Sequence, residues 1–329
     1  MVTLMRQLQE DPREMRTVYF QALLDAAESD PNIFVLDCDL ARSIGSAPFI
    51  QCFPDRHLDC GIQEANACGL AAGMSLRGFV PFVQSFGVFA SRRILDQIYI
   101  SCAYAGLNVK IIGADPGVTA AVNGGTHMAL EDAGILRAVP GVTIIEPSDP
   151  VMMYQVVRQM TEHYGVDYLR LNRKKAVRLY TEDSSFTIGK GALIRDGADV
   201  TIFACGIMVH EALKAAEILE REGISARVVD MFTIKPIDAD MIVESAERTG
   251  AVVTAENHSI IGGLGSAVAE VLGEKCPVPL ERVGVMDRFG EVGSVDYLKE
   301  RFGLTDQQIA EKARRAVRRK SAAGASGPR

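Results

Sequence analysis

The chain of 329 residues is 48% hydrophobic and 23% charged, with a formal net charge of −7, which indicates a globular protein large enough for two domains. Its acidic balance argues against nucleic-acid binding, because no basic patch is interleaved with aromatic residues, and no apolar run approaches the ~20 residues that span a membrane. Seven cysteines without C-x-x-C or zinc-ligand spacing, and an N-terminus unlike a signal peptide, favour a reduced cytoplasmic protein with no structural metal or disulfide.

Short β-branched runs alternate with amphipathic stretches in the first half of the chain. This alternation is typical of a parallel sheet that helices cover on both faces. In chain order we expect a strand at 33–39, a helix at 64–77, a strand at 79–85, a helix at 89–105, a strand at 108–114, a helix at 130–139, a strand at 142–147, a helix at 149–163 and a strand at 167–171.

Residues 172–199 are polar, contain glycine and lack helical periodicity, so we interpret them as a crossing between domains. A second α/β series follows, with strands expected at 200–206, 225–231, 251–257 and 279–285, helices at 208–223, 238–250 and 263–273, and a last helix from about Thr305.

The sequence therefore predicts an α/β fold with two domains, each a mostly parallel sheet flanked by helices. We place the first domain at 1–175, a linker at 176–190, the second domain at 191–320 and a disordered tail at 321–329.

Ligands of open parallel sheets gather at the carboxyl ends of the strands. The first candidates for a binding site are therefore the polar and aromatic residues that follow the expected strands of the first domain. They are Asp37, Asp39, Phe86, the loop 115–127 and Arg173.

The segment 113–137 is glycine-rich and much longer than the usual connection of ~2–6 residues. It carries His127 just before an expected helix. Long strand-to-helix loops often hold functional residues, which favours a role for His127 in binding or catalysis. The alternative is that Thr126 caps the helix and His127 is a surface residue of its first turn.

The sequence Gly-Gly-Leu-Gly at 262–265 also precedes an expected helix. It could hold a phosphate at the helix N-terminus, or it could simply allow the helix and a strand to approach closely. The full dinucleotide-binding pattern is absent, which favours the second interpretation.

Glu64 is the one carboxylate at the start of a helix of small residues, in DCGIQEANACGLAAG (59–73). A carboxylate in the first turn favours the helix dipole and can act as a cap. Alternatively, it is a buried group that needs a hydrogen-bonding partner or ligand. The residues alone leave both interpretations open.

The stretch 53–98, which contains Glu64, resembles the pyrimidine-binding domain of the transketolase family of thiamine diphosphate enzymes, and GGTHMALEDAGILRAVPGVTIIEPSDP (124–150) continues the resemblance. Downstream, VVDMFTIKPID (228–238) and ENHSIIGGLGSAVAEVLG (256–273) resemble the family's C-terminal domain. The resemblance covers about 14–318 in collinear order.

Full-length members also carry an N-terminal domain with a G-D-G…N-N motif, which this sequence lacks. The resemblance therefore implies the C-terminal subunit of a split transketolase. It further implies thiamine diphosphate as cofactor, with Mg²⁺ or Ca²⁺ held by a separate N-terminal diphosphate-binding subunit. An α2β2-type assembly is expected by the same resemblance.

The resemblance also gives roles to residues of the expected site. Glu64 matches the family glutamate that hydrogen-bonds the aminopyrimidine ring and so promotes removal of the thiazolium proton, which needs a dry environment. Phe86 and Phe89, in SFGVF, match the aromatic platform for the pyrimidine. His127 matches a histidine that faces the substrate and hydrogen-bonds a hydroxyl or moves a proton.

Three further residues match family positions. Asp39 and Ser43, in DCDLARS, match the pattern D-L-x-x-S; the resemblance places Asp39 among the cofactor-binding residues and Ser43 at a substrate phosphate. Arg173, in LNRKK, matches a phosphate-binding arginine.

The loop before His127 departs from the family pattern. Asn123 stands where an aspartate usually reads a sugar hydroxyl, Met128 replaces a glutamine, and Asp115 stands where a phosphate-binding histidine is common. A carboxylate at position 115 would repel a phosphate. The substrate is therefore expected to be an unphosphorylated or unusual keto compound, contacted by Ser43, Asp115, Asn123, His127 and Arg173.

The sequence predicts a transketolase-type subunit that transfers a two-carbon ketol unit from a ketose to an aldose. Two rivals share the architecture: the β subunit of a 2-oxo-acid dehydrogenase, and a deoxyxylulose-phosphate-synthase-like enzyme. A third alternative is a non-catalytic paralogue, which the presence of Glu64, Phe86, Phe89 and His127 argues against.

Overall fold

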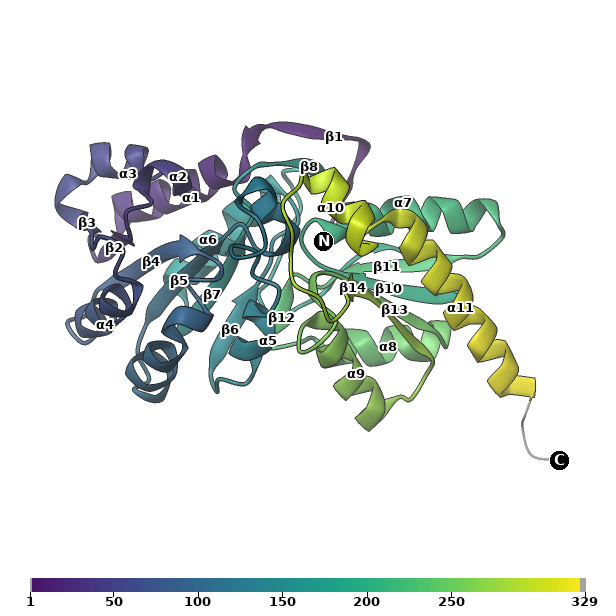
Figure 1. The fold of residues 1–329 in the computed structure, drawn as a ribbon. Helices are drawn as coiled ribbons and strands as arrows, with labels where there is room; N and C mark the ends of the chain where they lie inside the picture. Colours follow the sequence, from purple (N-terminus) through teal and green to yellow (C-terminus); the bar gives the residue numbers. More distant parts are fainter. Residues whose placement is uncertain (1, 326–329) are drawn as a thin grey trace.

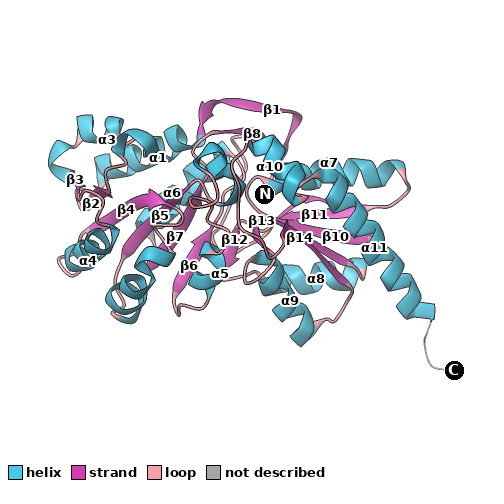
Figure 2. Ribbon diagram, in the orientation of Figure 1, coloured by secondary structure: helices cyan, strands magenta, loops and turns pink. Residues whose placement is uncertain are grey.

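The computed structural model describes residues 2–325, which form two mostly parallel sheets, each covered by helices (Figures 1 and 2). The first sheet has the strand order β12-β6-β7-β5-β4-β2-β3 and the second has the order β14-β13-β10-β11-β9. This confirms the predicted two-domain α/β fold.

Six parallel strands from the first half of the chain build the first sheet, and a strand from the second half, β12, adds antiparallel to β6 at its edge. Strands β5 and β7 are buried along their whole length, and the charged residues within them, Lys110, Asp167 and Arg170, are held in buried ion pairs. The strands are β2 (Ile33–Asp37), β3 (His57–Asp59), β4 (Val80–Phe86), β5 (Val109–Ala114), β6 (Val142–Ile145), β7 (Val166–Leu171) and β12 (Thr233–Lys235).

Helices α1 and α6 pack together over this sheet, and α4 packs with η3 and β4. The start of α6 is encoded locally, because the Asp149 side chain accepts the Met152 N–H at 2.8 Å and Pro150 opens the first turn. The helical segments are α1 (Met15–Ser29), α2 (Ala41–Ile44), α3 (Ala47–Cys52), η1 (Pro54–Arg56), α4 (Glu64–Ser75), η2 (Arg92–Ile94), η3 (Gln97–Tyr104), η4 (Gly117–Asn123), α5 (Asp132–Arg137) and α6 (Pro150–Glu162).

In the second domain, α7 packs with α11, and α8 packs with α9. Four strands are parallel, and β9 is antiparallel to β11. The elements are β9 (Ala192–Arg195), β10 (Val200–Ala204), α7 (Met208–Arg221), β11 (Ala226–Asp230), α8 (Ala239–Thr249), β13 (Val252–Ser259), α9 (Leu264–Lys275), β14 (Leu280–Val285), α10 (Val295–Phe302) and α11 (Asp306–Ala325).

Two segments differ from the expected elements. The stretch 89–105, expected to be one helix, forms the short 3₁₀ turn η2 and then the π-helix η3. Near the N-terminus, β1 (Leu4–Glu14) pairs antiparallel with β8 (Lys175–Tyr180), which lies in the expected interdomain crossing. Local periodicity does not reveal such a pair, because the two strands lie far apart along the chain.

The C-terminal helix α11 continues to Ala325. Residues 321–325, expected to begin a disordered tail, are therefore helical, because they continue the last turns of α11; residues 326–329 lie outside the described residues. Within residues 2–325, no helix combines the length and the apolar character that crossing a membrane requires.

The glycine sequence 262–265 brings helix α9 against strand β13. Glu256, fully buried on β13, accepts the backbone N–H groups of Leu264 at 2.7 Å and Gly265 at 2.8 Å. A Cβ on Gly263 would lie 2.0 Å from a Glu256 carboxylate oxygen. The N-terminus of α9 is thus filled by a side-chain carboxylate, which leaves no room for the phosphate considered above.

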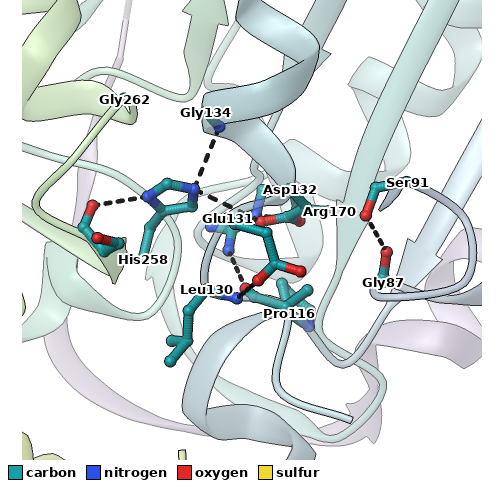
Figure 3. Close-up of polar contacts among 12 residues, drawn as sticks. Gly87, Ser91, Pro116, Leu130, Glu131, Asp132, Gly134, Arg170, His258 and Gly262 are labelled. Carbon is teal, nitrogen blue, oxygen red and sulfur yellow. Dashed lines mark hydrogen bonds and ion pairs between the residues drawn. The ribbon is translucent and has the colours of Figure 1, made fainter. Parts of the chain in front are cut away.

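The end of β13 also joins the two domains (Figure 3). His258 Nε2 accepts the Gly134 N–H at 3.2 Å, and its Nδ1 lies 2.7 Å from the Ser259 carbonyl oxygen, so the ring is neutral with its proton on Nδ1. Burial, followed by repulsion from Arg170, lowers the pKa of His258 to about 4, which agrees with this assignment.

Asn257, the neighbour of His258, fastens the segment that follows β5. Its Oδ1 accepts the Val118 N–H at 2.9 Å, and its Nδ2 donates to the Pro116 carbonyl at 2.9 Å. Because Asn257 is fully buried, water cannot replace its side chain as the hydrogen-bond partner of these two backbone groups. The second domain therefore holds the start of the loop that carries His127.

We predict that Glu256→Gln flattens the dependence of stability on pH. Burial raises the pKa of Glu256 from 4.5 to about 7, so the folded protein keeps a proton that the unfolded chain has already lost. Stability must therefore fall as pH rises through 7. Urea unfolding should show that the wild-type protein loses about 1 kcal/mol more than the variant between pH 6 and pH 8.

Asp230, whose pKa burial also raises to about 7, contributes in the same direction in both proteins and cancels in the comparison. Glu270→Gln, at an exposed position of the same helix α9, should leave the wild-type pH dependence unchanged. Equal pH dependence in the wild type and Glu256→Gln would contradict the prediction.

Asn257→Ala should destabilise the chain by about 2–4 kcal/mol, because it leaves the Val118 N–H and the Pro116 carbonyl buried without partners. Asn123→Ala, at an exposed position of the same loop, is the control and should change stability by less than about 0.5 kcal/mol. Chemical denaturation distinguishes the two, and similar values for both variants would refute the role given to Asn257.

Candidate active site

Glu64 opens helix α4 and lies buried against the end of β4. Only 4% of the residue is exposed, and it does not cap its helix. Its Oε1 accepts the Ser85 hydroxyl at 3.1 Å, and its Oε2 accepts a guanidinium N–H of Arg93 at 2.9 Å. Of the two interpretations of Glu64, the structure supports the buried carboxylate with side-chain partners.

Arg93 links Glu64 to an aromatic side chain. The centre of its guanidinium lies 3.7 Å from the ring centroid of Phe89, and 42% of its side chain is exposed. A planar cation stacked on an aromatic face gains about 0.5–2 kcal/mol, depending on how far it is desolvated. In the isolated chain, Arg93 therefore covers both the carboxylate and one face of the aromatic ring.

Phe86, Phe89 and His127 form a compact ring cluster. The Phe86 and Phe89 centroids are 6.3 Å apart, and the imidazole of His127 lies 5.7 Å and 5.3 Å from them. All three pairs meet edge to face, which the quadrupoles of aromatic rings favour. The loop histidine and the aromatic pair, which are distant in sequence, thus belong to one site.

The backbone around His127 packs against a loop of the second domain. A Cβ on Gly125 would lie 2.2 Å from the Gly290 carbonyl oxygen, and a Cβ on Gly290 would lie 2.4 Å from the sulfur of Met128. Glycine is needed at position 125, because a side chain there would meet the backbone of Gly290. His127 Nδ1 lies 2.9 Å from the Thr126 hydroxyl, so Thr126 contacts the imidazole.

Asp115 and Arg173 form an ion pair at the carboxyl ends of β5 and β7. The Arg173 Nε donates to Asp115 Oδ2 at 2.8 Å, and a second guanidinium N–H donates to the same oxygen. A third donates to the Ser43 carbonyl at 2.6 Å. The Arg173 guanidinium also lies 5.0 Å from the Phe86 centroid, which joins this pair to the ring cluster.

The structure thus connects seven of the nine expected site residues through a continuous series of contacts: Glu64, Phe86, Phe89, His127, Arg173, Asp115 and Ser43. Asp39 and Asn123 are exposed and stand outside this series. The backbone N–H of Asp39 donates to Asp59 at 2.9 Å, beside β2 and β3.

Sequence reasoning missed Arg93, Ser85 and Asn257. Arg93 lies four residues after Phe89, but an arginine in a surface stretch does not by itself indicate a functional site. Asn257 lies near the end of a strand of the second sheet, so the carboxyl-end rule could have identified it had it been applied to that domain.

Family models match both domains. The model described as "Transketolase, pyrimidine binding domain" matches residues 11–177, and the model described as "Transketolase, C-terminal domain" matches residues 189–309. Together the two matches cover most of the chain and correspond to its two sheets.

Two curated relatives of similar length are named as transketolase subunits. The chain is 52% identical over 307 residues to the 6-deoxy-6-sulfo-D-fructose transketolase subunit SqwH of Clostridium sp. (strain MSTE9), covering 93% of this chain and 95% of the relative. It is 34% identical over 305 residues to one subunit of the apulose-4-phosphate transketolase of Phocaeicola vulgatus, covering 92% and 97%.

A solved structure agrees with these relatives. It is described as "Split gene transketolase, inactive beta4 tetramer", and the chain matches it with a TM-score of 0.87 and 43% identity, covering 93% of this chain and 99% of that one. The deoxyxylulose-phosphate-synthase alternative is weaker, because this chain spans only 47% of such a relative at 35% identity. The chain therefore belongs to the transketolase family, as a subunit of a thiamine diphosphate-dependent split transketolase.

Proposed function

We propose that the Glu64 cluster is the aminopyrimidine half of the thiamine diphosphate site. One observation carries this proposal: a buried carboxylate lies beside two phenylalanine rings and a histidine at the carboxyl edge of a parallel sheet. These residues fit the group, because an aminopyrimidine offers a flat face for stacking and ring nitrogens for hydrogen bonds.

Each residue has a defined task in this proposal. Glu64 holds or shares a proton with the ring; each of its oxygens can accept a further hydrogen bond beyond those from Ser85 and Arg93. Phe86 and Phe89 hold the plane of the ring and exclude water. His127 faces the substrate and moves a proton or binds a hydroxyl. The cofactor itself supplies the nucleophilic carbon for transfer of a two-carbon ketol unit.

The rest of the cofactor site belongs to another chain in this proposal. A separate N-terminal subunit holds the diphosphate and its Mg²⁺ or Ca²⁺, since this sequence lacks the G-D-G…N-N motif. Asp39, exposed next to β2 and β3, is available to groups supplied by that second chain. In this proposal the assembly is of α2β2 type and the location is cytoplasmic. Residues 176–190 form the linker between the two domains.

The ion pair of Asp115 and Arg173 points to the substrate class. Arg173, expected to bind a phosphate, is bound to the Asp115 carboxylate, which adds a negative charge where a phosphate would lie. A dianionic phosphate is disfavoured there more than a monoanionic sulfonate or a neutral hydroxyl. We therefore propose a ketose without phosphate as donor; 6-deoxy-6-sulfofructose, named for the SqwH relative, fits this class.

Ser43, Asn123 and His127 complete the proposed substrate contacts. The backbone carbonyl of Ser43 accepts a hydrogen bond from Arg173, and Asn123 is exposed in the loop before His127. No contact in the site favours a 2-oxo-acid dehydrogenase β subunit or a non-catalytic paralogue.

Glu64→Gln should lower the kcat of the reconstituted enzyme by at least about 10²-fold, because an amide cannot share a proton with the ring. The fold should survive, because the amide of Gln can still form hydrogen bonds with the Ser85 hydroxyl and the Arg93 guanidinium. The assay mixes this chain with a diphosphate-binding subunit of a split transketolase and follows ketol transfer, with circular dichroism as a check on folding.

Glu131→Gln is the control, because Glu131 is a partly exposed carboxylate that pairs with Arg92 outside the proposed cofactor site. It should keep kcat within about twofold. Either chain alone should be inactive. Wild-type turnover by the Glu64→Gln variant would show that this carboxylate has only a structural role.

Asp115→His should shift the donor preference toward phosphorylated ketoses. The change removes a carboxylate and frees the Arg173 guanidinium, so kcat/KM for fructose 6-phosphate relative to 6-deoxy-6-sulfofructose should rise about tenfold. Glu131→Gln, which lies outside the proposed substrate contacts, is the control for general effects of a substitution near the site. An unchanged ratio in Asp115→His would remove the ion pair from the determinants of specificity.

A further inference from the structure

The connection between β14 and α10, residues 286–294, borders the active-site loop (Figure 1). A Cβ on Gly124 would lie 2.9 Å from a methyl carbon of Val292, and Gly290 contacts the same loop, as described above. Helix α10 also packs against η4, the first part of that loop. A surface segment of the second domain therefore lies next to the loop that carries His127.

Three apolar side chains around this contact are exposed. Phe289 is 96% exposed, Val122 on η4 is 74% exposed and Val292 is 67% exposed. Phe289 has the highest exposed fraction of any large apolar side chain in the part of the chain that the structure describes. Single exposed apolar residues are common on protein surfaces, but apolar residues that gather from two domains indicate an interaction site. We call Val122, Phe289 and Val292 the rim patch.

The segment that presents Phe289 is held by side chains at its base. Glu291 Oε1 accepts the Tyr297 hydroxyl at 2.8 Å and the Arg301 Nε–H at 3.0 Å, and the Ser294 hydroxyl accepts the Tyr297 N–H at 3.3 Å. These bonds fasten the segment to α10. A partner that binds a fastened segment loses less free energy to ordering than one that binds a free loop.

The surroundings of Phe289 are those of an interface anchor. Asp287 and Arg288, its neighbours along the chain, are exposed and charged. An aromatic side chain within a charged or polar rim is typical of the residues that contribute most to association between proteins.

The position of the rim patch indicates which protein covers it. In the function proposed above, one cofactor molecule contacts the Glu64 cluster and also the diphosphate site of a second chain. The cofactor is small, so that second chain must reach the edge of the site beside His127. A stable interface buries about 800 Å² on each partner, which extends well beyond the contacts of a single cofactor ring. The apolar surface next to His127 is therefore within reach of that chain.

We propose that the rim patch is a docking surface for the diphosphate-binding subunit, and that Phe289 enters an apolar pocket of that subunit. The proposal rests on the proposed function, which places the second half of the cofactor site on another chain. It gives the second domain a part in assembly: the segment that contacts the His127 loop also presents the anchor for the partner. Docking and the position of His127 are then connected through one short segment.

The test measures assembly separately from turnover. Isothermal titration calorimetry gives the Kd between this chain and the diphosphate-binding subunit of a split transketolase, with thiamine diphosphate and Mg²⁺ present. Phe289→Ala should raise this Kd at least about tenfold, because truncation of an aromatic anchor removes a large share of the binding free energy. The melting temperature of the variant chain alone should equal that of the wild type, since the removed side chain is exposed.

Tyr164→Ala is the matched control. Tyr164 is an aromatic residue, 68% exposed, and it lies two residues before β7, at the amino edge of the first sheet and thus opposite the site. Its variant should bind the partner subunit like the wild type. An unchanged Kd in Phe289→Ala, or equal weakening in both variants, would overturn the proposal.

Two further measurements separate docking from chemistry and from self-association. With saturating partner subunit, Phe289→Ala should reach the wild-type kcat within about twofold, whereas Glu64→Gln should form the assembly but lose turnover. A low kcat of Phe289→Ala at saturation would assign Phe289 to the reaction site and refute a docking role. Sedimentation velocity of the chain alone tests the other occupant: a loss of self-association in Phe289→Ala, with an unchanged Kd for the partner subunit, would assign the rim patch to a second copy of this chain.

Discussion

The buried guanidinium of Arg170 joins the two halves of this protein. Its Nε donates to Asp132 at 2.9 Å (Figure 3). One terminal nitrogen donates to Glu146 at 2.5 Å, and the other donates to the Asn257 carbonyl at 3.0 Å. A fully buried charge is costly unless partners replace the lost water. These partners come from both domains, so the domains can only pack in an arrangement that keeps all of them in place.

The active-site loop depends on that arrangement. Asn257 fixes the loop where it leaves β5, Gly290 touches it near His127, and His258 holds the helix that follows. The second domain contributes none of the residues expected to touch the cofactor, yet it determines where the histidine of the first domain lies. The closeness of His127 to Phe86 and Phe89 is therefore a consequence of the packing between the two domains.

The ionic groups of the site are already paired in the single chain. Glu64 is bound to Arg93, and Asp115 is bound to Arg173. Removing one member of a pair leaves the other charge in a less favourable environment, and this is severe for Glu64 because it is buried. Two helix N-termini at the edge of the second sheet are satisfied in different ways: Glu256 accepts the first N–H groups of α9, whereas at α7 the Met208 and Val209 N–H groups donate to the Cys205 and Gly206 carbonyls.

The sequence by itself determined the strands, most helices and the chemical types in the site. Strands such as β5 and β7 are marked by short runs rich in apolar and β-branched residues, and Asp149 with Pro150 marks a helix start, so these signals are local. Only the tertiary structure decided that Glu64 contacts Arg93, that Asp115 binds Arg173 and that β1 pairs with β8. Those contacts join residues distant along the chain, and their energies depend on burial and distance, which no local pattern encodes.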